Sequence, residues 1–199
     1  NAAIVGLGWW GKTLVEAAEN SDVIRFVSGT SRTMTPEVEA FAKQKGLHLT
    51  KEYDGLLHHG GVDAVVLATP HSMHATQVIA AANAGKHIYC EKPFTQTRRE
   101  AEDAIAAVRK AGVTLAVGYN RRFHPEMGKL REMIRAGELG TILHVEATMT
   151  FANVLSINPK HWRADKAETP LGGLTPNEFG ALLPPHLTAD PERRDRIAR

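Results

Sequence analysis

Short apolar runs alternate with helical patterns along the first 118 residues of the chain. The run at residues 63–68 is apolar almost throughout, which is typical of a strand covered on both faces. Such runs predict strands at residues 2–5, 23–28, 47–50, 63–68, 87–90 and 113–117. Strands that alternate with helices form a doubly wound parallel sheet, so we expect a Rossmann-type α/β domain.

Several predicted helices are marked by the residues that cap them. A helix at residues 35–45 is indicated by Thr35 as its N-cap, Pro36 at its first position and Gly46 at its end. A second strong helix, at residues 97–111, is amphipathic and stops at Gly112. Further helices are predicted at residues 11–19, 72–84 and 125–136.

The pattern changes after residue 120. Residues 142–151 alternate between apolar and polar side chains, as in a sheet with one solvated face, and prolines interrupt the periodicity beyond Phe151. We therefore expect a Rossmann domain at residues 1–120. A partial α/β domain with an open, mainly antiparallel sheet is expected at residues 121–199. Because a partial sheet leaves strand edges unpaired, a homo-oligomer is also an expectation.

Composition excludes several classes of protein. With 43% hydrophobic residues, 23% charged residues and a net charge of +2, the 199-residue chain is typical of a globular protein. No run approaches the ~20 apolar residues of a membrane span, and no basic stripe indicates nucleic-acid binding. The single cysteine, Cys90, fits a reducing compartment, so a cytoplasmic location is expected. The scattered histidines lack the spacing of metal ligands.

A glycine-rich loop follows the first predicted strand. Gly6, Gly8 and Gly11 form a G-x-G-x-x-G pattern between strand and helix, which is the context of a dinucleotide-binding site. Gly6 would permit the tight turn, Gly8 would let the backbone approach a pyrophosphate, and Gly11 would let helix and strand pack closely. The N–H groups at the helix start would then bind the phosphates. Trp9 and Trp10 would cover the cofactor or fill the core.

The same segment has an alternative interpretation. Because Lys12 and Thr13 follow Gly11, it also fits G-x-x-x-x-G-K-[ST], the P-loop of nucleotide hydrolases. Two features count against this function. Asp63 begins its strand, whereas a P-loop enzyme needs an acid at a strand end, and bulky aromatic residues occupy positions that would wrap phosphate.

The end of the second strand favours one cofactor. No acid is present there to bind the ribose 2′-hydroxyl of NAD. Hydroxyl groups and a guanidinium, suited to the 2′-phosphate of NADP, come from Ser28, Thr30, Ser31 and Arg32. NADP is therefore expected in preference to NAD. The alternative is that Arg32 is a solvated loop residue.

Later motifs resemble those of one family. They are Ala68-Thr69-Pro70 with His74, Cys90-Glu91-Lys92-Pro93, Gly118-Tyr119-Asn120-Arg121-Arg122-Phe123-His124-Pro125, and Trp162-Arg163 before Gly172-Gly173. With these, residues 2–175 resemble glucose–fructose oxidoreductase, inositol dehydrogenase and their relatives (Gfo/Idh/MocA). The resemblance implies a Rossmann domain joined to an open-sheet α/β domain. It also implies NAD(P)-dependent hydride transfer to or from a small molecule such as a sugar or polyol.

The resemblance gives Lys92 a catalytic role. A parallel sheet binds its ligands beyond the carboxyl ends of its strands, and Lys92 lies just past one of them. Its ammonium would hydrogen-bond a substrate hydroxyl or carbonyl during hydride transfer. Glu91 would orient Lys92, and Pro93 would fix the backbone, with a cis bond as one way to do so. A surface Glu–Lys pair is the structural alternative.

Other candidates come from the same resemblance. Thr69, Pro70, His71 and His74 belong to a turn that approaches the nicotinamide in the family, and Glu91, Lys92 and Arg122 are also counted as cofactor-binding residues. A histidine at a helix start is, however, as often a local hydrogen-bonding residue. Arg122 would position substrate or fix the domain junction. Cys90 is expected to be a buried strand residue, because no base accompanies it.

The sequence departs from the family where an Asp and a His should follow the glycine pair. Their expected positions are occupied by Pro176 and Gly180, and the chain ends earlier than its relatives, as in a C-terminal truncation. The main hypothesis is an NAD(P)-dependent oxidoreductase. The alternative within the family is a catalytically impaired, NADP-binding remnant or a regulatory protein.

Overall fold

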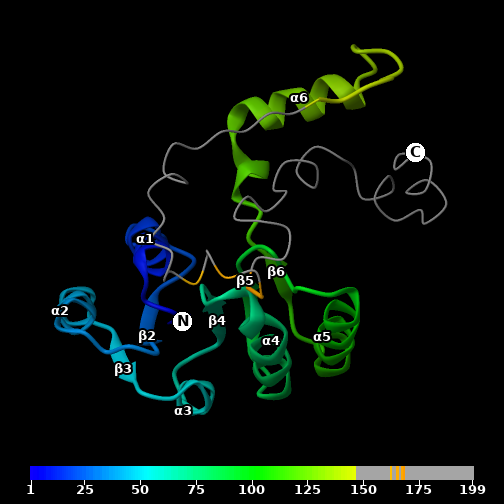
Figure 1. Ribbon diagram of the computed structural model, residues 1–199. Coiled ribbons are helices and arrows are strands. Elements are labelled where there is room, and N and C mark those ends of the chain that lie inside the picture. Colours follow the sequence, from blue (N-terminus) through cyan, green and yellow to red (C-terminus); the bar gives the residue numbers. More distant parts are fainter. Residues whose placement is uncertain (147–161, 163–164, 166, 169–199) are drawn as a thin grey trace. The chain divides into compact units, whose positions relative to one another are not determined.

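Residues 1–146, 162, 165 and 167–168 are described by the computed structural model of the chain (Figure 1). The chain divides into two units, Asn1–Gly118 and Tyr119–Arg199. No helix among the described residues is long and apolar enough to cross a membrane.

The first unit is built on a six-stranded sheet in which every strand pair is parallel. The spatial order of the strands is β3-β2-β1-β4-β5-β6. Their bounds are β1 (Ala2–Val5), β2 (Phe26–Thr30), β3 (His48–Thr50), β4 (Ala64–Leu67), β5 (His87–Cys90) and β6 (Leu115–Val117). The predicted Rossmann topology is confirmed, with the strand order reversing between β1 and β4.

Helices cover both faces of the sheet (Figure 1). They are α1 (Trp9–Ala17), α2 (Pro36–Lys45), α3 (Tyr53–Leu57), α4 (His74–Asn83) after the short η1 (His71–Met73), and α5 (Arg98–Ala111). Ile4 and Val66 belong to one core cluster, with residues of α1 and α2. Ala3, Val65 and Leu67 belong to the other, with residues of α3, α4 and α5. Successive strand residues thus alternate between two buried layers, which explains the apolar run.

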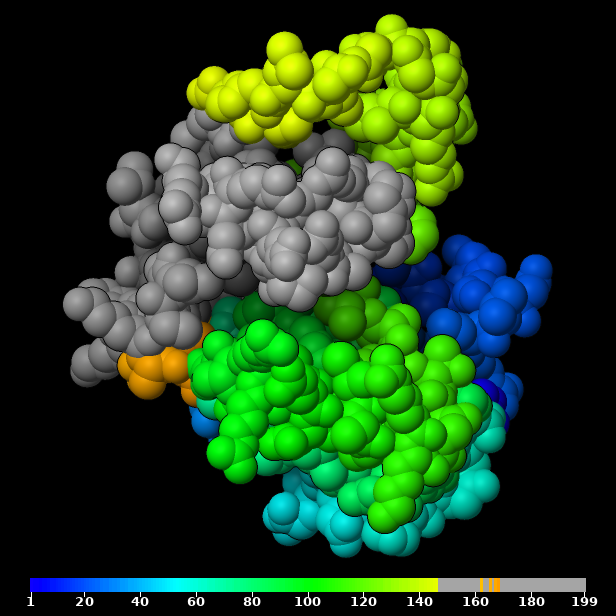
Figure 2. Space-filling model, turned by 90° about the vertical axis from the view of Figure 1, so that its right-hand side faces the viewer, coloured from blue at the N-terminus to red at the C-terminus, as the bar shows by residue number. Residues whose placement is uncertain are grey.

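The predicted capping residues of two helices are confirmed. The side chain of Thr35 accepts a hydrogen bond from the backbone N–H of Val38, and Gly46 ends α2 with a left-handed φ of 66°. At α5, Thr97 and Glu100 accept hydrogen bonds from each other's backbone N–H groups. Each cap is worth about 1 kcal/mol. Figure 2 shows α5 (green) on the surface, and its buried side chains are Ala104 and Val108.

Other predicted boundaries need correction. The second strand begins at Phe26, three residues later than expected, because the hydroxyl of Ser21 accepts hydrogen bonds from the backbone N–H groups of Val23 and Ile24 and folds them into a turn. Val23 is accordingly 90% exposed. Helix α1 begins at Trp9, two residues earlier than predicted, and the last strand begins at Leu115 instead of residue 113.

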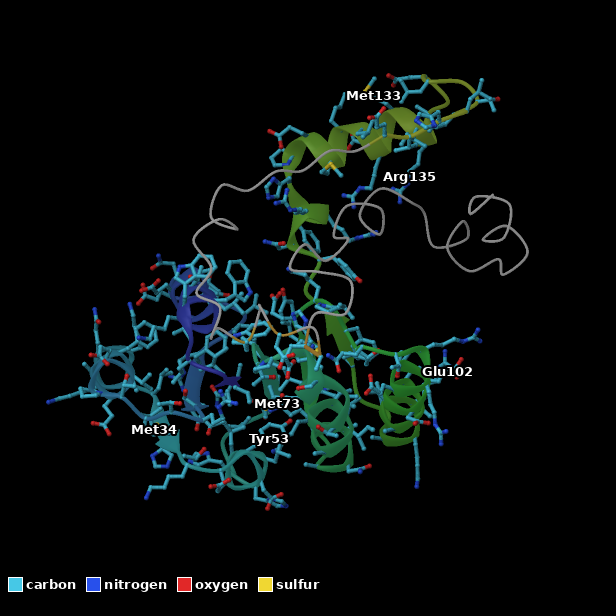
Figure 3. The ribbon with its side chains drawn as sticks, in the orientation of Figure 1. Met34, Tyr53, Met73, Glu102, Met133 and Arg135 are labelled. Atoms are coloured by element: carbon cyan, nitrogen blue, oxygen red, sulfur yellow. The ribbon has the colours of Figure 1, made fainter. Side chains whose placement is uncertain are left out.

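Helix α3 has no counterpart among the sequence predictions. Its five residues are too few to show a helical period. Tertiary contacts stabilise it, since Leu56 and Leu57 are buried in the core. Tyr53 is labelled in Figure 3. Its hydroxyl donates a hydrogen bond to the carbonyl oxygen of Gln77 in α4 at 2.8 Å.

The described part of the second unit contains helices but no strand. It contains η2 (Asn120–Phe123) and α6 (Pro125–Arg135), which matches the predicted helix to within one residue. The strand predicted at residues 142–151 is not formed over residues 142–146. Residues 147–151 lie outside the described part of the chain, as do Pro176 and Gly180.

Candidate functional site

The candidate site lies at the carboxyl edge of the sheet, where β1 and β4 are neighbours. Backbone hydrogen bonds hold the residues that follow the strands side by side at this edge. The N–H of Gly6 donates to Thr30 at 2.8 Å, that of Ala68 donates to Val5 at 2.8 Å, and that of Glu91 donates to Leu67 at 2.9 Å. A doubly wound sheet binds its ligands in the crevice beyond this edge, at the point where strand order reverses.

Each glycine of the loop after β1 meets a different requirement. Gly6 has a φ of +97°, and a β-carbon there would lie 2.7 Å from the carbonyl oxygen of Ala68. A β-carbon at Gly11 would collide with the carbonyl oxygen of Gly6, so Gly11 allows α1 to pack on the turn. A β-carbon at Gly8 would meet no atom within 4 Å. Gly8 therefore leaves a stretch of backbone accessible to a ligand.

The start of α1 is suited to an anion. Gly8 is the N-cap and supplies no side-chain hydrogen bond, and the first turn contains no acidic residue. Unpaired N–H groups and the helix dipole give such an end a partial positive charge. The buried Nε1 of Trp10 has no hydrogen-bond partner among the described residues, while Trp9 beside it is 75% exposed. These features fit the pyrophosphate of a dinucleotide.

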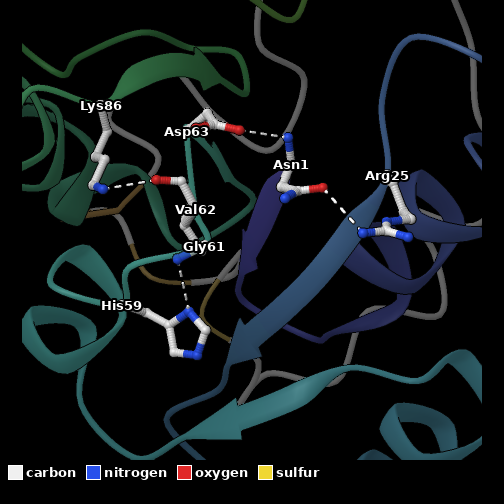
Figure 4. Close-up of polar contacts among 7 residues, drawn as sticks. All are labelled: Asn1, Arg25, His59, Gly61, Val62, Asp63 and Lys86. Atoms are coloured by element: carbon white, nitrogen blue, oxygen red, sulfur yellow. Dashed lines mark hydrogen bonds and ion pairs between the residues drawn. The ribbon is translucent and has the colours of Figure 1, made fainter.

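The structure contradicts the P-loop alternative. Since α1 begins at Trp9, Lys12 and Thr13 lie inside the helix, and the Thr13 hydroxyl donates a hydrogen bond to the carbonyl oxygen of Trp9 at 3.1 Å. Asp63 lies at the amino end of β4, where its carboxylate accepts a hydrogen bond from the amino group of Asn1 at 2.7 Å (Figure 4). It is at the opposite edge of the sheet from the glycine loop, so it could not hold magnesium there.

The four candidates around the end of β2 divide into two groups. Ser28 is fully buried, and its hydroxyl donates to the carbonyl oxygen of His48 at 2.8 Å. Thr30 is 5% exposed and donates to the carbonyl oxygen of Lys51 at 3.3 Å. These two hydroxyls therefore join β2 to β3 and its following turn. Ser31 is half-buried and Arg32 is exposed, so these two side chains are the accessible ones of the four.

The turn after β5 holds the residues expected to support Lys92. Glu91 is 6% exposed, and its carboxylate accepts hydrogen bonds from the Tyr89 hydroxyl and from the backbone N–H of Lys92, each at 3.3 Å. The peptide bond between Lys92 and Pro93 is cis. Glu91 therefore contacts the backbone of Lys92, and Lys92 itself is half-buried at the same edge as the glycine loop.

Sequence reasoning missed the roles of two residues that lie against Glu91, Tyr89 in β5 and Gly118 after β6. A β-carbon at Gly118 would lie 2.7 Å from a carboxylate oxygen of Glu91 and 2.8 Å from the Tyr89 hydroxyl, so only glycine leaves room for both. Burial first, and then the neighbouring Glu91, raise the pKa of Tyr89 to about 12, so Tyr89 stays a hydrogen-bond donor. A glycine directly after β6 was the available signal.

His74 joins the turns that follow β4 and β5. Its imidazole is fully buried, with Nδ1 2.8 Å from the carbonyl oxygen of Pro93 and Nε2 3.0 Å from that of Thr69. Burial lowers the pKa of His74. The side chain of Thr69 in turn donates to Gln77 at 2.6 Å. His74 thus holds these two turns together, which is the local hydrogen-bonding role considered above for a histidine at a helix start. His71 is 9% exposed and its ring centroid lies 5.9 Å from that of His74.

The remaining candidates have these positions. Pro70 begins the turn before η1 and is half-buried. Cys90 is fully buried in β5, and burial raises the pKa of its thiol to about 12, so it is a core residue as expected. Arg122 belongs to η2 in the second unit. The described residues contain no cluster of His, Cys, Asp or Glu that could hold a metal ion.

Comparisons with known proteins agree with this geometry. Residues 1–119 match the GFO_IDH_MocA family model, described as an oxidoreductase family with an NAD-binding Rossmann fold. An uncharacterized oxidoreductase of Bacillus subtilis, YrbE, is 37% identical over 139 residues, which cover 69% of this chain and 40% of YrbE. The scyllo-inositol 2-dehydrogenase (NADP(+)) IolU of the same organism is 28% identical over 146 residues, which cover 73% of this chain and 44% of IolU.

Solved structures share the fold. The crystal structure of scyllo-inositol dehydrogenase from Lactobacillus casei, with bound NAD(H) and scyllo-inositol, matches with a TM-score of 0.65 at 26% identity. The match covers 71% of this chain and 42% of that protein. The chain thus spans less than half the length of these relatives, which include proteins that use NAD and NADP. On its glycine loop, its strand order and these matches, the chain belongs to the Gfo/Idh/MocA family of oxidoreductases.

Proposed function

We propose that this chain carries the cofactor half of an NADP-dependent dehydrogenase or reductase acting on a sugar, a polyol or a related hydroxyl or carbonyl compound. One observation carries the proposal. The open backbone at Gly8 and the half-buried Lys92 lie at the same edge of one sheet, on either side of the point where strand order reverses. The relatives that act on scyllo-inositol support the substrate class.

Different residues at this edge would bind different parts of the cofactor. The loop from Gly6 to Gly11 would hold the pyrophosphate on the N–H groups at the start of α1. Ser31 and Arg32 would bind the 2′-phosphate, and the turn at Thr69, Pro70 and His71 would border the nicotinamide. The nicotinamide, when bound, supplies or accepts the hydride.

Lys92 would handle the proton that accompanies hydride transfer. As an ammonium, its Nζ can donate a hydrogen bond to a substrate oxygen, polarise a carbonyl and give up or take back a proton. Glu91 supports this role because its carboxylate accepts a hydrogen bond from the backbone N–H of Lys92. We also propose that residues 121–199 belong to the substrate-binding α/β domain, with Arg122 as a substrate-positioning or junction residue.

A second candidate within the family is a protein that binds NADP without turnover. The positions where the family has its Asp and His carry Pro176 and Gly180, neither of which can transfer a proton. In that case Lys92 would hold a ligand without catalysing its reaction. Cytoplasmic location and homo-oligomer formation stay predictions under both candidates.

Titration of the purified chain with NADPH, NADH and ATP tests the proposal, with tryptophan fluorescence as the readout because Trp9 and Trp10 flank the phosphate loop. We expect NADPH to bind in the micromolar range, NADH to bind more weakly and ATP with magnesium not to bind. A screen of inositols and sugars for NADP reduction then separates the two candidates. Binding of ATP alone, or of no nucleotide, would refute the proposed function.

A further inference from the structure

Two lysines contact the same aromatic ring from different helices. The Nζ atom of Lys12 in α1 lies 5.4 Å from the ring centroid of Phe41 in α2, and that of Lys45 lies 5.7 Å from it. Lys12 also donates a hydrogen bond to the carbonyl oxygen of Glu37 at 3.5 Å. Lys45 instead forms an ion pair with Glu19, beyond the end of α1. The lysines therefore lie at opposite ends of the α1–α2 contact.

The position of Lys12 places it at the cofactor edge of the sheet. Helices α1 and α2 both begin where the chain leaves the carboxyl edge, after β1 and β2. Lys12 is the fourth residue of α1, and Glu37 is the second residue of α2. Their hydrogen bond therefore joins the first turns of the two helices, next to the loop that connects β2 to α2.

The β2–α2 loop presents a second cation. Arg32 is exposed, and its guanidinium forms no hydrogen bond or ion pair with another described residue. Met34, labelled in Figure 3, packs against the core cluster that contains Phe41, and Thr35 caps α2. The loop is thus anchored just after Arg32, and Lys12 contacts the first turn of the helix that follows the loop.

The ammonium of Lys12 retains hydrogen-bonding capacity. An ammonium has three donors, and the described residues use one of them, in a contact at the long limit for a hydrogen bond. Phe41 is only 9% exposed and belongs to the core, so its ring is a fixed surface on which the ammonium packs. A cation on a ring of this kind keeps its charge available to an anion.

We propose that Lys12 is a specificity residue for NADP, which contributes with Arg32 the positive charge that binds the 2′-phosphate. This inference rests on the proposed cofactor function. It gives a role to the Gly-Lys-Thr segment, which fits a P-loop by sequence but is helical in the structure. NAD has a hydroxyl at the same ribose position, so removing Lys12 should affect the two cofactors differently.

The carboxylate of Glu37 should weaken phosphate binding at this site. The pKa of its exposed carboxyl lies below its ordinary value, chiefly because the Thr35 side chain hydrogen-bonds it, with the nearby Lys12 as a smaller cause. A carboxylate close to Lys12 would repel a bound phosphate. Glu37→Gln should therefore strengthen NADPH binding severalfold and leave NADH binding unchanged.

The test compares Lys12→Met with Lys45→Met in the whole chain. Both variants remove a lysine from the Phe41 ring, but Lys45 lies away from the cofactor edge. Dissociation constants are measured for NADPH and NADH, and for adenosine 2′,5′-bisphosphate against 5′-AMP. A charge-assisted hydrogen bond predicts that Lys12→Met weakens the two 2′-phosphorylated ligands about tenfold or more, with NADH and 5′-AMP within about twofold. Lys45→Met should leave all four constants unchanged.

Three outcomes would overturn the inference. Equal losses for NADPH and NADH would make Lys12 a structural residue of α1, and an unchanged NADPH constant would remove it from the site. In both cases the wild-type chain still binds NADPH, so the proposed function stands. A wild-type chain that binds neither nicotinamide would refute both. Matching thermal unfolding of the two variants controls for folding.

Discussion

The Nδ1 atom of His74 lies 2.8 Å from the carbonyl oxygen of Pro93, which joins helix α4 to the turn that carries Lys92. The other ring nitrogen lies 3.0 Å from the carbonyl oxygen of Thr69, at the end of β4. The buried imidazole therefore fixes two turns of the candidate site relative to each other. Because the imidazole is buried, its charge state also affects the stability of the first unit.

His74 should make the first unit less stable in acid. Burial lowers the pKa of His74 below its ordinary value of 6.5, so the unfolded chain takes up a proton at a higher pH than the folded one. The stabilisation is complete above the unfolded pKa and is lost as the pH falls through the folded pKa. Urea unfolding at neutral pH and at about pH 5 should therefore show a steeper loss of stability in the wild type than in His74→Gln. Equal slopes would contradict this role.

Gly8 and Gly11 should respond differently to the same substitution. An added methyl group at Gly8 enters open space, so Gly8→Ala should cost only about 0.5 kcal/mol of stability while blocking the approach of a pyrophosphate. Gly11→Ala collides with the Gly6 carbonyl and should cost ~2–4 kcal/mol. Thermal unfolding and NADPH titration of both variants separate the effects. Retention of NADPH affinity in Gly8→Ala would argue against the proposed phosphate loop.

Gly118→Ala should disturb the hydrogen bonds around Glu91. The new methyl group would displace both the Glu91 carboxylate and the Tyr89 hydroxyl, with a loss of about 1–3 kcal/mol in the free energy of unfolding. Gly55→Ala in α3 is the matched control, because a β-carbon there meets no atom within 4 Å and alanine favours a helix. Denaturant unfolding of both variants measures the difference. Equal stability of the two variants would show that Glu91 can shift without cost.

Lys92→Ala should separate binding from turnover. We expect NADP affinity to stay nearly unchanged, because the phosphate loop and Arg32 are untouched, and any turnover with a polyol substrate to disappear. Lys110→Ala, on the exposed surface of α5, is the control and should change neither quantity. Steady-state rates and cofactor titrations measure both effects. A tenfold loss of cofactor affinity with turnover intact would contradict the role given to Lys92.

Features that depend on neighbours in the sequence were predictable. The caps at Thr35 and Thr97 act within three residues, and the apolar run ending at Leu67 reports burial on both faces of a strand. The glycine loop was also predictable, because Gly6 and Gly11 meet requirements set by the strand and helix that they join. The cis bond before Pro93 was anticipated as one option by resemblance, and its presence follows from the structure alone.

Contacts between distant residues were decided by the tertiary structure. Ser28 was expected to meet a cofactor but bonds to His48, twenty residues away, because strand pairing places β3 beside β2. The sequence by itself determined the parallel α/β architecture and the glycine loop, since periodicity and turn chemistry are local. Only the tertiary structure decided which polar groups are already satisfied and which, like Lys12, keep donors to offer. That depends on where strand order reverses and which helices pack together, which no local pattern encodes.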